Sequence, residues 1–211
     1  MIDDLVAAAI HDAKNALLAL DVQLAAAECR PASADFRGAR GQVSRIATDL
    51  ARLLTLYRAQ QGRLHLHIDD RDLSDFLDDT VAELGPLPAQ LTLQVDRDSA
   101  AHTGAWAFDA YLLRLVLLDA LRNALRHAAA RITFAVERLD GGGIAFAVSD
   151  DGPGFPTEIL RGAADTSGDG STGLGLSFAQ LIATSHVTPD GRRGRVELAN
   201  TPGACFRLVL P

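Results

Sequence analysis

Cysteine is nearly missing from this 211-residue chain, which contains only Cys29 and Cys205. Two cysteines so far apart provide neither a disulfide framework nor the ligand spacing of a structural metal site, and they fit a reducing compartment. Positive charge is also in the minority, because 20 Lys and Arg residues stand against 27 Asp and Glu residues and leave a net charge of −7. A general nucleic-acid-binding role is therefore not expected.

Long apolar runs are absent from the sequence as well. No segment approaches the roughly 20 consecutive apolar residues that cross a bilayer. Asp3 and Asp4 occupy the region in which a signal peptide carries positive charge. We therefore expect a cytoplasmic location without direct membrane insertion, either for the whole protein or for a cytosolic piece of a larger one. Hydrophobic residues still make up 48% of the chain, enough for one or two small cores.

The N-terminal part of the chain has helical periodicity. Apolar side chains recur at steps of three and four from Val6 to Ala27, and again from Phe36 to Tyr57. Pro31 interrupts the pattern between these stretches, which predicts an antiparallel α-helical hairpin. Pairing of two hairpins into a dimeric four-helix bundle would bury the apolar stripes that one hairpin leaves uncovered. The alternative is that the hairpin packs on the rest of its own chain.

Beyond Gly62, strand-like and helical patterns alternate along the chain. We expect an α/β sandwich with one mixed sheet and helices on one face. Two domains are expected, residues 1–62 and residues 63–211. The expected strands are 63–68, 91–95, 131–138, 144–149, 195–199 and 205–210, and the expected helices are 74–84 with Ser74 as its cap, 109–128 and 173–185.

Two glycine-rich segments in the second domain indicate a nucleotide site. Asp150-Asp151-Gly152-Pro153-Gly154 follows a strand-like run, and Gly170-Ser171-Thr172-Gly173-Leu174-Gly175 opens a helical pattern about twenty residues later. A carboxylate such as that of Asp150 can accept a hydrogen bond from the amino group of adenine. The glycines let backbone N–H groups approach phosphate, and a helix N-terminus adds positive potential.

The expected helix 109–128 carries polar side chains among its apolar ones. Asp119, Asn123, Arg126 and His127 are spaced as i, i+4, i+7 and i+8 and so share one face of the helix. Burying such groups is costly without a task. Together they could hold Mg²⁺ and phosphates, although a solvated polar face is the alternative interpretation.

The order of these features resembles the GHKL ATPase superfamily and, more narrowly, the catalytic core of a bacterial sensor histidine kinase. The resemblance covers nearly the whole chain and implies a GHKL-type (Bergerat) ATPase fold with ATP and Mg²⁺ as ligands. It also implies that Asn123 binds Mg²⁺, that Asp150 recognises adenine, and that a lid covers ATP at 156–172. The other residues that the resemblance implies at the nucleotide are Arg126, His127, Gly152, Gly154, Thr172, Gly173, Leu174 and Gly175.

The same resemblance extends to the helical hairpin. His11-Asp12-Ala13-Lys14-Asn15 is similar to the H box of the family, which implies that His11 is phosphorylated. Asp12 is expected to accept the imidazole proton, and the position of Asn15 serves dephosphorylation of the response regulator in the family. We therefore expect a homodimer that phosphorylates itself from ATP and passes the phosphate to the receiver domain of a response regulator. Its input would come from a separate sensor protein or from sequence upstream.

Two departures from the family pattern leave other functions open. The family has a conserved helical segment called the N box, to which Asn123 belongs. Asp119 occupies the place of the first Asn of this box, where an acid could activate a nucleophile or assist Mg²⁺. The aromatic F box is missing from residues 157–166, which makes the lid short. One alternative is a histidine phosphotransferase with a degenerate ATPase domain, which relays phosphate between receiver domains without using ATP. A Ser/Thr anti-sigma-factor kinase of the same superfamily would suit Asp119 but not the H box.

Overall fold

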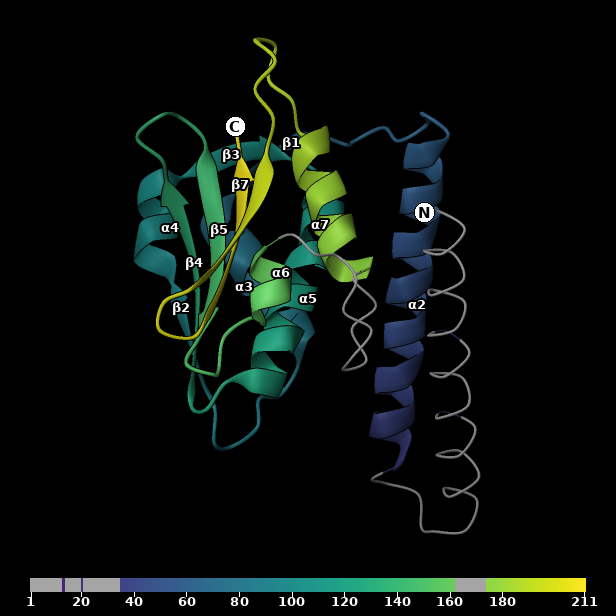
Figure 1. The fold of residues 1–211 in the computed structure, drawn as a ribbon, viewed down its shortest axis with the longest axis vertical. Helices are drawn as coiled ribbons and strands as arrows, with labels where there is room; N and C mark the ends of the chain where they lie inside the picture. The colour runs from purple at the N-terminus through teal and green to yellow at the C-terminus, as the bar shows by residue number, and fades with distance from the viewer. Residues whose placement is uncertain (1–12, 14–19, 21–34, 162–173) are drawn as a thin grey trace. The chain divides into compact units, whose positions relative to one another are not determined.

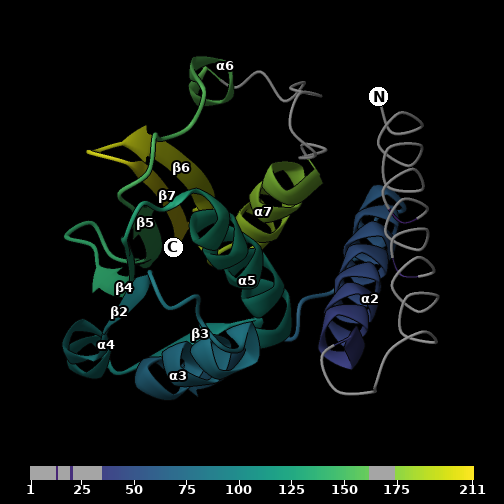
Figure 2. The same cartoon turned by 90° about the horizontal axis from the view of Figure 1, so that it is seen from below.

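A computed structural model describes residues 35–161 and 174–211, together with residues 13 and 20. The chain divides into two compact units that meet in sequence at Leu64 and His65. In the described part of the chain, the first unit consists mainly of helix α2 (Asp35–Gln60), and the second unit contains residues 65–161 and 175–211. Figure 1 labels most of the elements, and Figure 2 also labels β6.

Helix α2 ends where the sequence predicted. Its last residue is Gln60, and Gly62 then adopts a φ of 64° while its N–H donates to the Ala59 carbonyl. Such a left-handed glycine is a common way to end a helix. The other half of the predicted hairpin, residues 1–34, lies outside the described residues apart from positions 13 and 20. The hairpin and the dimeric four-helix bundle therefore stay predictions.

The second unit contains a mixed five-stranded sheet, as predicted. The strand order is β2-β4-β5-β7-β6, in which β2 runs parallel to β4 and the other neighbours are antiparallel. Each strand of this sheet matches its prediction to within one residue at either end. The strands are β2 (Thr92–Asp96), β4 (Arg131–Arg138), β5 (Ile144–Asp150), β6 (Arg195–Asn200) and β7 (Ala204–Leu210).

The predictions of a single sheet and of a strand at 63–68 are wrong. A second sheet is formed by β1 (Asp69–Asp72) and β3 (Ala105–Phe108), which pair antiparallel from Asp69 opposite Phe108 onward. Helix α5 begins directly after β3, so His67, just before β1, lies beside the start of a helix instead of a strand. The His67 N–H accordingly donates to the Asp109 carboxylate, at 2.9 Å.

The two helices that matter most for the site lie on one face of the five-stranded sheet (Figure 2). Helix α5 (Ala110–His127) confirms the predicted long helix, and it begins at Asp109, whose Oδ1 accepts the Leu112 N–H at 3.0 Å. Helix α7 (Leu174–Ser185) lies within the predicted helix 173–185, of which residue 173 is outside the described residues. Both helices are expected from their apolar periodicity, because that pattern buries one side of a helix against a sheet.

Three other helices differ from the prediction or were not predicted. Helix α3 (Leu73–Leu84) is capped by Asp72 and not by Ser74, because the Asp72 carboxylate reaches the Asp75 N–H in the first turn at 3.0 Å. Helix α4 (Arg97–Thr103) and helix α6 (Thr157–Leu160) were not predicted. One or two turns are too short to produce a periodic pattern.

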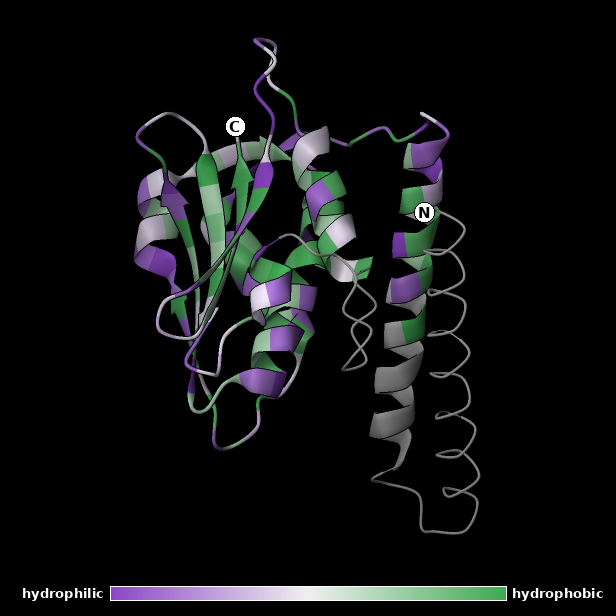
Figure 3. Cartoon of the chain, viewed as in Figure 1, coloured by the Kyte–Doolittle hydropathy of each residue, from purple (hydrophilic) through white to green (hydrophobic). Residues whose placement is uncertain are grey.

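Aromatic side chains from three elements form the centre of the core. Phe76 of α3, Phe108 of β3 and Phe146 of β5 meet edge to face, with ring centroids 4.9–5.6 Å apart. Leu113, Leu117 and Leu121 of α5 are fully buried along one side of that helix. Burial of each such side chain contributes roughly 1.5–3 kcal/mol. Figure 3 shows hydrophobic residues along β5 and β7, the strands at the centre of the sheet.

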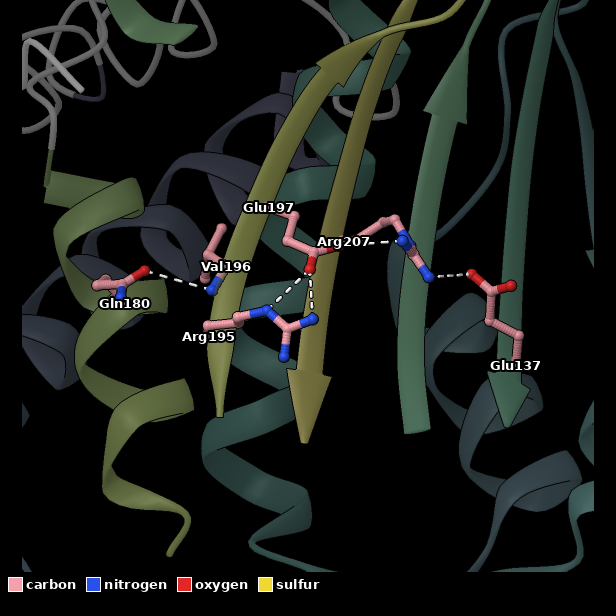
Figure 4. A network of polar contacts seen from close by, with 6 residues as sticks. All are labelled: Glu137, Gln180, Arg195, Val196, Glu197 and Arg207. Atoms are coloured by element: carbon pink, nitrogen blue, oxygen red, sulfur yellow. Dashed lines mark hydrogen bonds and ion pairs between the residues drawn. The ribbon is translucent and has the colours of Figure 1, made fainter. Parts of the chain in front are cut away.

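The other face of the sheet carries a chain of ion pairs (Figure 4). Arg207 of β7 contacts Glu137 at 2.6 Å and Glu197 at 3.0 Å, and Arg195 contacts Glu197 at 2.6 Å. Such partly exposed pairs contribute at most about 1 kcal/mol each. At the outer strand β6, the Val196 N–H donates to the side-chain oxygen of Gln180 on α7, at 3.3 Å.

Candidate nucleotide-binding site

Asp150, the expected adenine ligand, is the last residue of β5 and is only 8% exposed. Its Oδ1 accepts the N–H of Gly152 at 2.8 Å, which closes a turn in which a side chain takes the place of a backbone carbonyl. This bond orients the carboxylate relative to the loop that follows. A preoriented carboxylate is what recognition of a flat base by hydrogen bonding requires.

Gly152 lies directly against the end of α5. A Cβ at this position would be 2.3 Å from the carbonyl oxygen of His127, the last residue of the helix, and 2.9 Å from Asp150 Oδ1. Backbone atoms cannot withdraw from such a contact without moving the helix end, so glycine is required here. The expected adenine loop and the helix of Asp119 and Asn123 therefore meet at this point.

Asp151 ties the same loop to the connection after α5, a role that the sequence reasoning missed. Its Oδ1 accepts three consecutive backbone N–H groups, those of Ala129, Ala130 and Arg131, at 2.9–3.0 Å. In the other direction the Asp151 N–H donates to the Arg131 carbonyl at 3.2 Å. The N–H groups of Ala130 and Arg131 lower the pKa of the Asp151 carboxyl below 3.8. An Asp directly after a strand is a signal for this kind of turn.

Asn200, at the end of β6, holds the other side of the loop. Its Oδ1 accepts the Phe155 N–H at 2.7 Å, and its Nδ2 donates to the Phe155 carbonyl at 3.0 Å. Gly154 has a φ of +84° and would place a Cβ 2.6 Å from the Asn200 carboxamide. The sequence reasoning missed Asn200, because an Asn before Thr-Pro-Gly is an ordinary turn signal.

The start of α7 comes close to the polar side of α5. A Cβ on Gly175 would lie 2.3 Å from Asp119 Oδ2, so the second glycine segment and the N-box acid are in contact. Asp119 and Asn123 are half-buried, one turn apart on α5, whereas Arg126 and His127 are exposed at its end. Leu174, the first residue of α7, is buried.

Only part of the predicted site lies among the described residues. The beginning of the predicted lid, residues 156–161, is described and contains the single turn of α6 where a flexible loop was expected. Predicted site residues outside the described part of the chain are His11, Asp12, Asn15, Thr172 and Gly173. Of the predicted site residues, Asp119, Asn123, Arg126 and His127 are on α5, Gly152 and Gly175 lie against it, Asp150 bonds to Gly152, and Gly154 lies against Asn200 of β6.

A second polar cluster lies at the opposite end of α5. The buried Asp109 carboxylate accepts the His67 N–H through Oδ2, and the Asp109 N–H donates to His186 Nε2 at 3.1 Å. His186 Nδ1 is 2.8 Å from the Ile182 carbonyl, so the neutral imidazole donates from Nδ1 and accepts at Nε2. Burial lowers the pKa of His186, against the opposing effects of Ile182 and the Asp109 charge. The cluster joins α5, α7 and the segment after α2.

Within the ranges that the structure describes, no helix is long and apolar enough to cross a membrane. The same ranges contain no group of three or more His, Cys, Asp or Glu residues placed to hold a metal ion. Mg²⁺ does not need such a group, since it is usually bound by one or two protein oxygens together with substrate phosphates and water.

Comparison with known proteins shows what most of the second unit is similar to. Residues 108–211 match the family of histidine kinase-, DNA gyrase B- and HSP90-like ATPases. The chain is 29% identical over 189 residues to the sensor protein KdpD of Rathayibacter rathayi, which covers 86% of this chain and 21% of that protein. It is 28% identical over 169 residues to the signal transduction histidine-protein kinase AfsQ2 of Streptomyces coelicolor, which covers 75% of this chain and 29% of that protein.

The fold is also found among solved structures. Histidine kinase AdeS of Acinetobacter baumannii has a TM-score of 0.61 and 18% identity, covering 95% of this chain and 96% of that chain, a likeness that concerns the fold alone. This chain spans less than a third of the length of the two curated relatives. The family match includes the helix of Asp119 and both glycine segments. Residues 108–211 therefore resemble the ATPase domain shared by histidine kinases, DNA gyrase B and HSP90, and the matching relatives include a histidine-protein kinase.

Proposed function

We propose that this chain is the kinase core of a two-component system. Residues 1–62 would form the dimerisation and histidine-phosphotransfer hairpin, and residues 63–211 the ATP-binding catalytic domain. The observation that carries the proposal is the position of α5 between the two glycine segments, in contact with Gly152 at His127 and with Gly175 at Asp119. A nucleotide with adenine at one segment and phosphates at the other would lie along the polar side of this helix.

The residues around α5 fit MgATP. Asp150 would accept the adenine amino group, and the amides of Gly152, Gly154 and the α7 N-terminus would face the nucleotide. Asn123 would bind Mg²⁺ with Asp119 beside it. A carboxamide and a carboxylate are suitable oxygen donors, and glycine at 175 leaves open the space that a Cβ would take from the Asp119 carboxylate. Bound Mg²⁺ supplies charge neutralisation at the phosphates. Proposed further contacts are Arg126, His127, Thr172, Gly173 and Leu174.

The proposed reaction has two steps. A nitrogen of the His11 imidazole attacks the γ-phosphorus of ATP, the bond to the β-phosphate oxygen breaks, ADP leaves, and Asp12 accepts the imidazole proton. The carboxylate of a response-regulator Asp then takes the phosphoryl group and regenerates His11. Asn15 would orient the water that later hydrolyses the regulator's acyl phosphate. The proposed partners are a second copy of the chain, a receiver domain and a sensor, all in the cytoplasm.

The alternative function, phosphate relay without ATP, has weaker support. The curated relatives are a sensor protein and a signal transduction histidine-protein kinase. Asp150 and Gly152 also retain the turn and the close contact with α5 that an adenine site needs. A degenerate ATPase domain that no longer binds ATP would not require this geometry.

Incubation of the full chain with γ-labelled ATP and Mg²⁺ tests the proposal. We expect acid-labile label on the unsubstituted chain, none on His11→Ala although it still binds ATP, and neither label nor binding on Asp150→Asn. His102→Ala is a matched control, because His102 is an exposed histidine on α4 and should label normally. Label that persists on His11→Ala would refute its assignment. A chain that takes no label from ATP but accepts phosphate from a receiver domain would establish the alternative.

A further inference from the structure

We infer that Asp151 is a positioning residue of the nucleotide site. Its carboxylate holds the end of α5 against the adenine loop, defined as residues 150–155, and so fixes the distance between the adenine ligand Asp150 and the Mg²⁺ ligand Asn123. The inference rests on the proposed function and assigns a task to a residue that contacts neither the base nor the metal.

The backbone that follows α5 presents three N–H donors to one carboxylate, that of Asp151. At Ala128, which follows the last residue of α5, the backbone leaves helical geometry with φ −58° and ψ 140°. The next three N–H groups then converge on a single oxygen, Asp151 Oδ1, at 2.9, 3.0 and 3.0 Å. Hydrogen bonds to an ionised acceptor are stronger than those to a neutral one. The arrangement therefore favours a carboxylate at this position.

Asp151 and Gly152 act on the same helix end in different ways. Gly152 only contacts the His127 carbonyl, and a contact without hydrogen bonds does not oppose separation. The bonds of Asp151 supply that restraint. Asn200 holds the loop on its other side, and both of its hydrogen bonds connect β6 to Phe155. Loss of the Asp151 carboxylate should thus leave the loop in place on the sheet while the end of α5 is released from it.

Asn123 is one helical turn before His127, so release of this end shifts the proposed Mg²⁺ ligand relative to Asp150. A ligand that uses both residues should lose more affinity than one that uses Asp150 alone. MgATP belongs to the first class, and ADP without Mg²⁺ belongs to the second. The ratio of the two affinities is therefore a measure of positioning, which a simple loss of folded protein would not change.

Calorimetric titration of the full chain with MgATP, and separately with ADP in chelator, tests the inference. For Asp151→Ala we expect the Kd of MgATP to rise about tenfold, as for loss of a residue that supports a metal ligand, with a smaller rise for ADP and unchanged stoichiometry. Asp151→Asn keeps an oxygen in the same place and should restore most of the affinity. Asp140→Ala removes the same charge from an exposed site in the β4–β5 turn and should bind like the unsubstituted chain.

The possible outcomes distinguish failure of the positioning role of Asp151 from failure of the proposed function. An unchanged Kd for MgATP in Asp151→Ala, or equal losses for MgATP and ADP, would overturn the positioning role and leave the ATP site intact. Asp151→Asn as weak as Asp151→Ala would also overturn it, since charge and not the bonds would then be responsible. No binding of either nucleotide by the unsubstituted chain would overturn the proposed function and this inference with it.

Discussion

Lowering the pH from about 7.5 to about 5.5 is expected to destabilise the second unit through one buried imidazole. His186 is 5% exposed, accepts the Asp109 N–H at Nε2 and donates from Nδ1 to the Ile182 carbonyl. A proton added to Nε2 would therefore point at a backbone donor. Burial lowers the pKa of His186 below its ordinary value of 6.5, and this effect exceeds those of Ile182 and the Asp109 charge.

The size of the effect follows from proton linkage. Below about pH 6.5 the unfolded chain binds a proton at this imidazole that the folded chain does not bind. The contribution of His186 to stability is thus complete above that pH and is lost as the pH falls toward the folded pKa. If the folded imidazole stays neutral, the loss is about 1.4 kcal/mol between about pH 7.5 and 5.5. The carboxyls of Asp96, Asp151 and Asp190 have a pKa lowered below 3.8 and do not contribute in this window.

Urea unfolding of the full chain at both pH values gives the required free energies. Trp106 in β3 is the only tryptophan, so its fluorescence reports on the second unit. His186→Gln is the control, because its side-chain oxygen can accept the Asp109 N–H but the amide does not titrate. The other histidines are common to both chains, and the difference between the two pH dependences isolates His186.

Equal pH dependences for the two chains would refute the reasoning, because His186 would then be protonated equally in the folded and unfolded states. A difference of opposite sign, with the unsubstituted chain gaining relative stability at low pH, would mean that the Asp109 charge outweighs burial.

Two further substitutions test contacts at the two ends of α5. Asp109→Asn leaves one oxygen for the amides of Leu112 and His67. We expect the free energy of unfolding in urea to fall by about 1–3 kcal/mol and the hydrogen exchange of one of these amides to become faster. Unchanged protection of both amides from hydrogen exchange would contradict the role of the Asp109 carboxylate in holding them. Gly175→Ala puts a methyl group 2.3 Å from Asp119 Oδ2, so the carboxylate must move; we expect labelling by ATP to fall on the order of 10- to 100-fold while ADP still binds without Mg²⁺. An unaltered labelling rate would remove Asp119 from the site.

The parts of the fold that the sequence predicted are those with a regular apolar pattern. Helix α5 and the five strands of the larger sheet have apolar patterns that set both their type and their length. Strand β1 has no such pattern: Asp69-Asp70-Arg71-Asp72 is polar and exposed at every position, and it is a strand because β3 lies beside it. The alternating pattern at 63–68 was misleading for the same reason. A strand needs a neighbouring strand to pair with, and a sequence pattern does not show whether one is there.

The site divides in a similar way. Asp150, Gly152, Gly154 and Gly175 were identifiable because their chemistry and spacing are characteristic of nucleotide binding. The supporting residues were not. Asn200 acts on Phe155, 45 positions away, and His186 acts on Asp109, 77 positions away. Such partners become visible only when the strands and helices have been assembled.

The bond between Gln180 and the Val196 amide has a consequence for self-association. An outer strand normally offers its unpaired amides to a strand of another molecule, which is how sheets grow into aggregates. At β6 an incoming strand must first displace the Gln180 side chain and then pass the ion pair of Arg195 and Glu197. Growth of the sheet along this edge is therefore opposed, even where several copies of the ATPase domain are held close together.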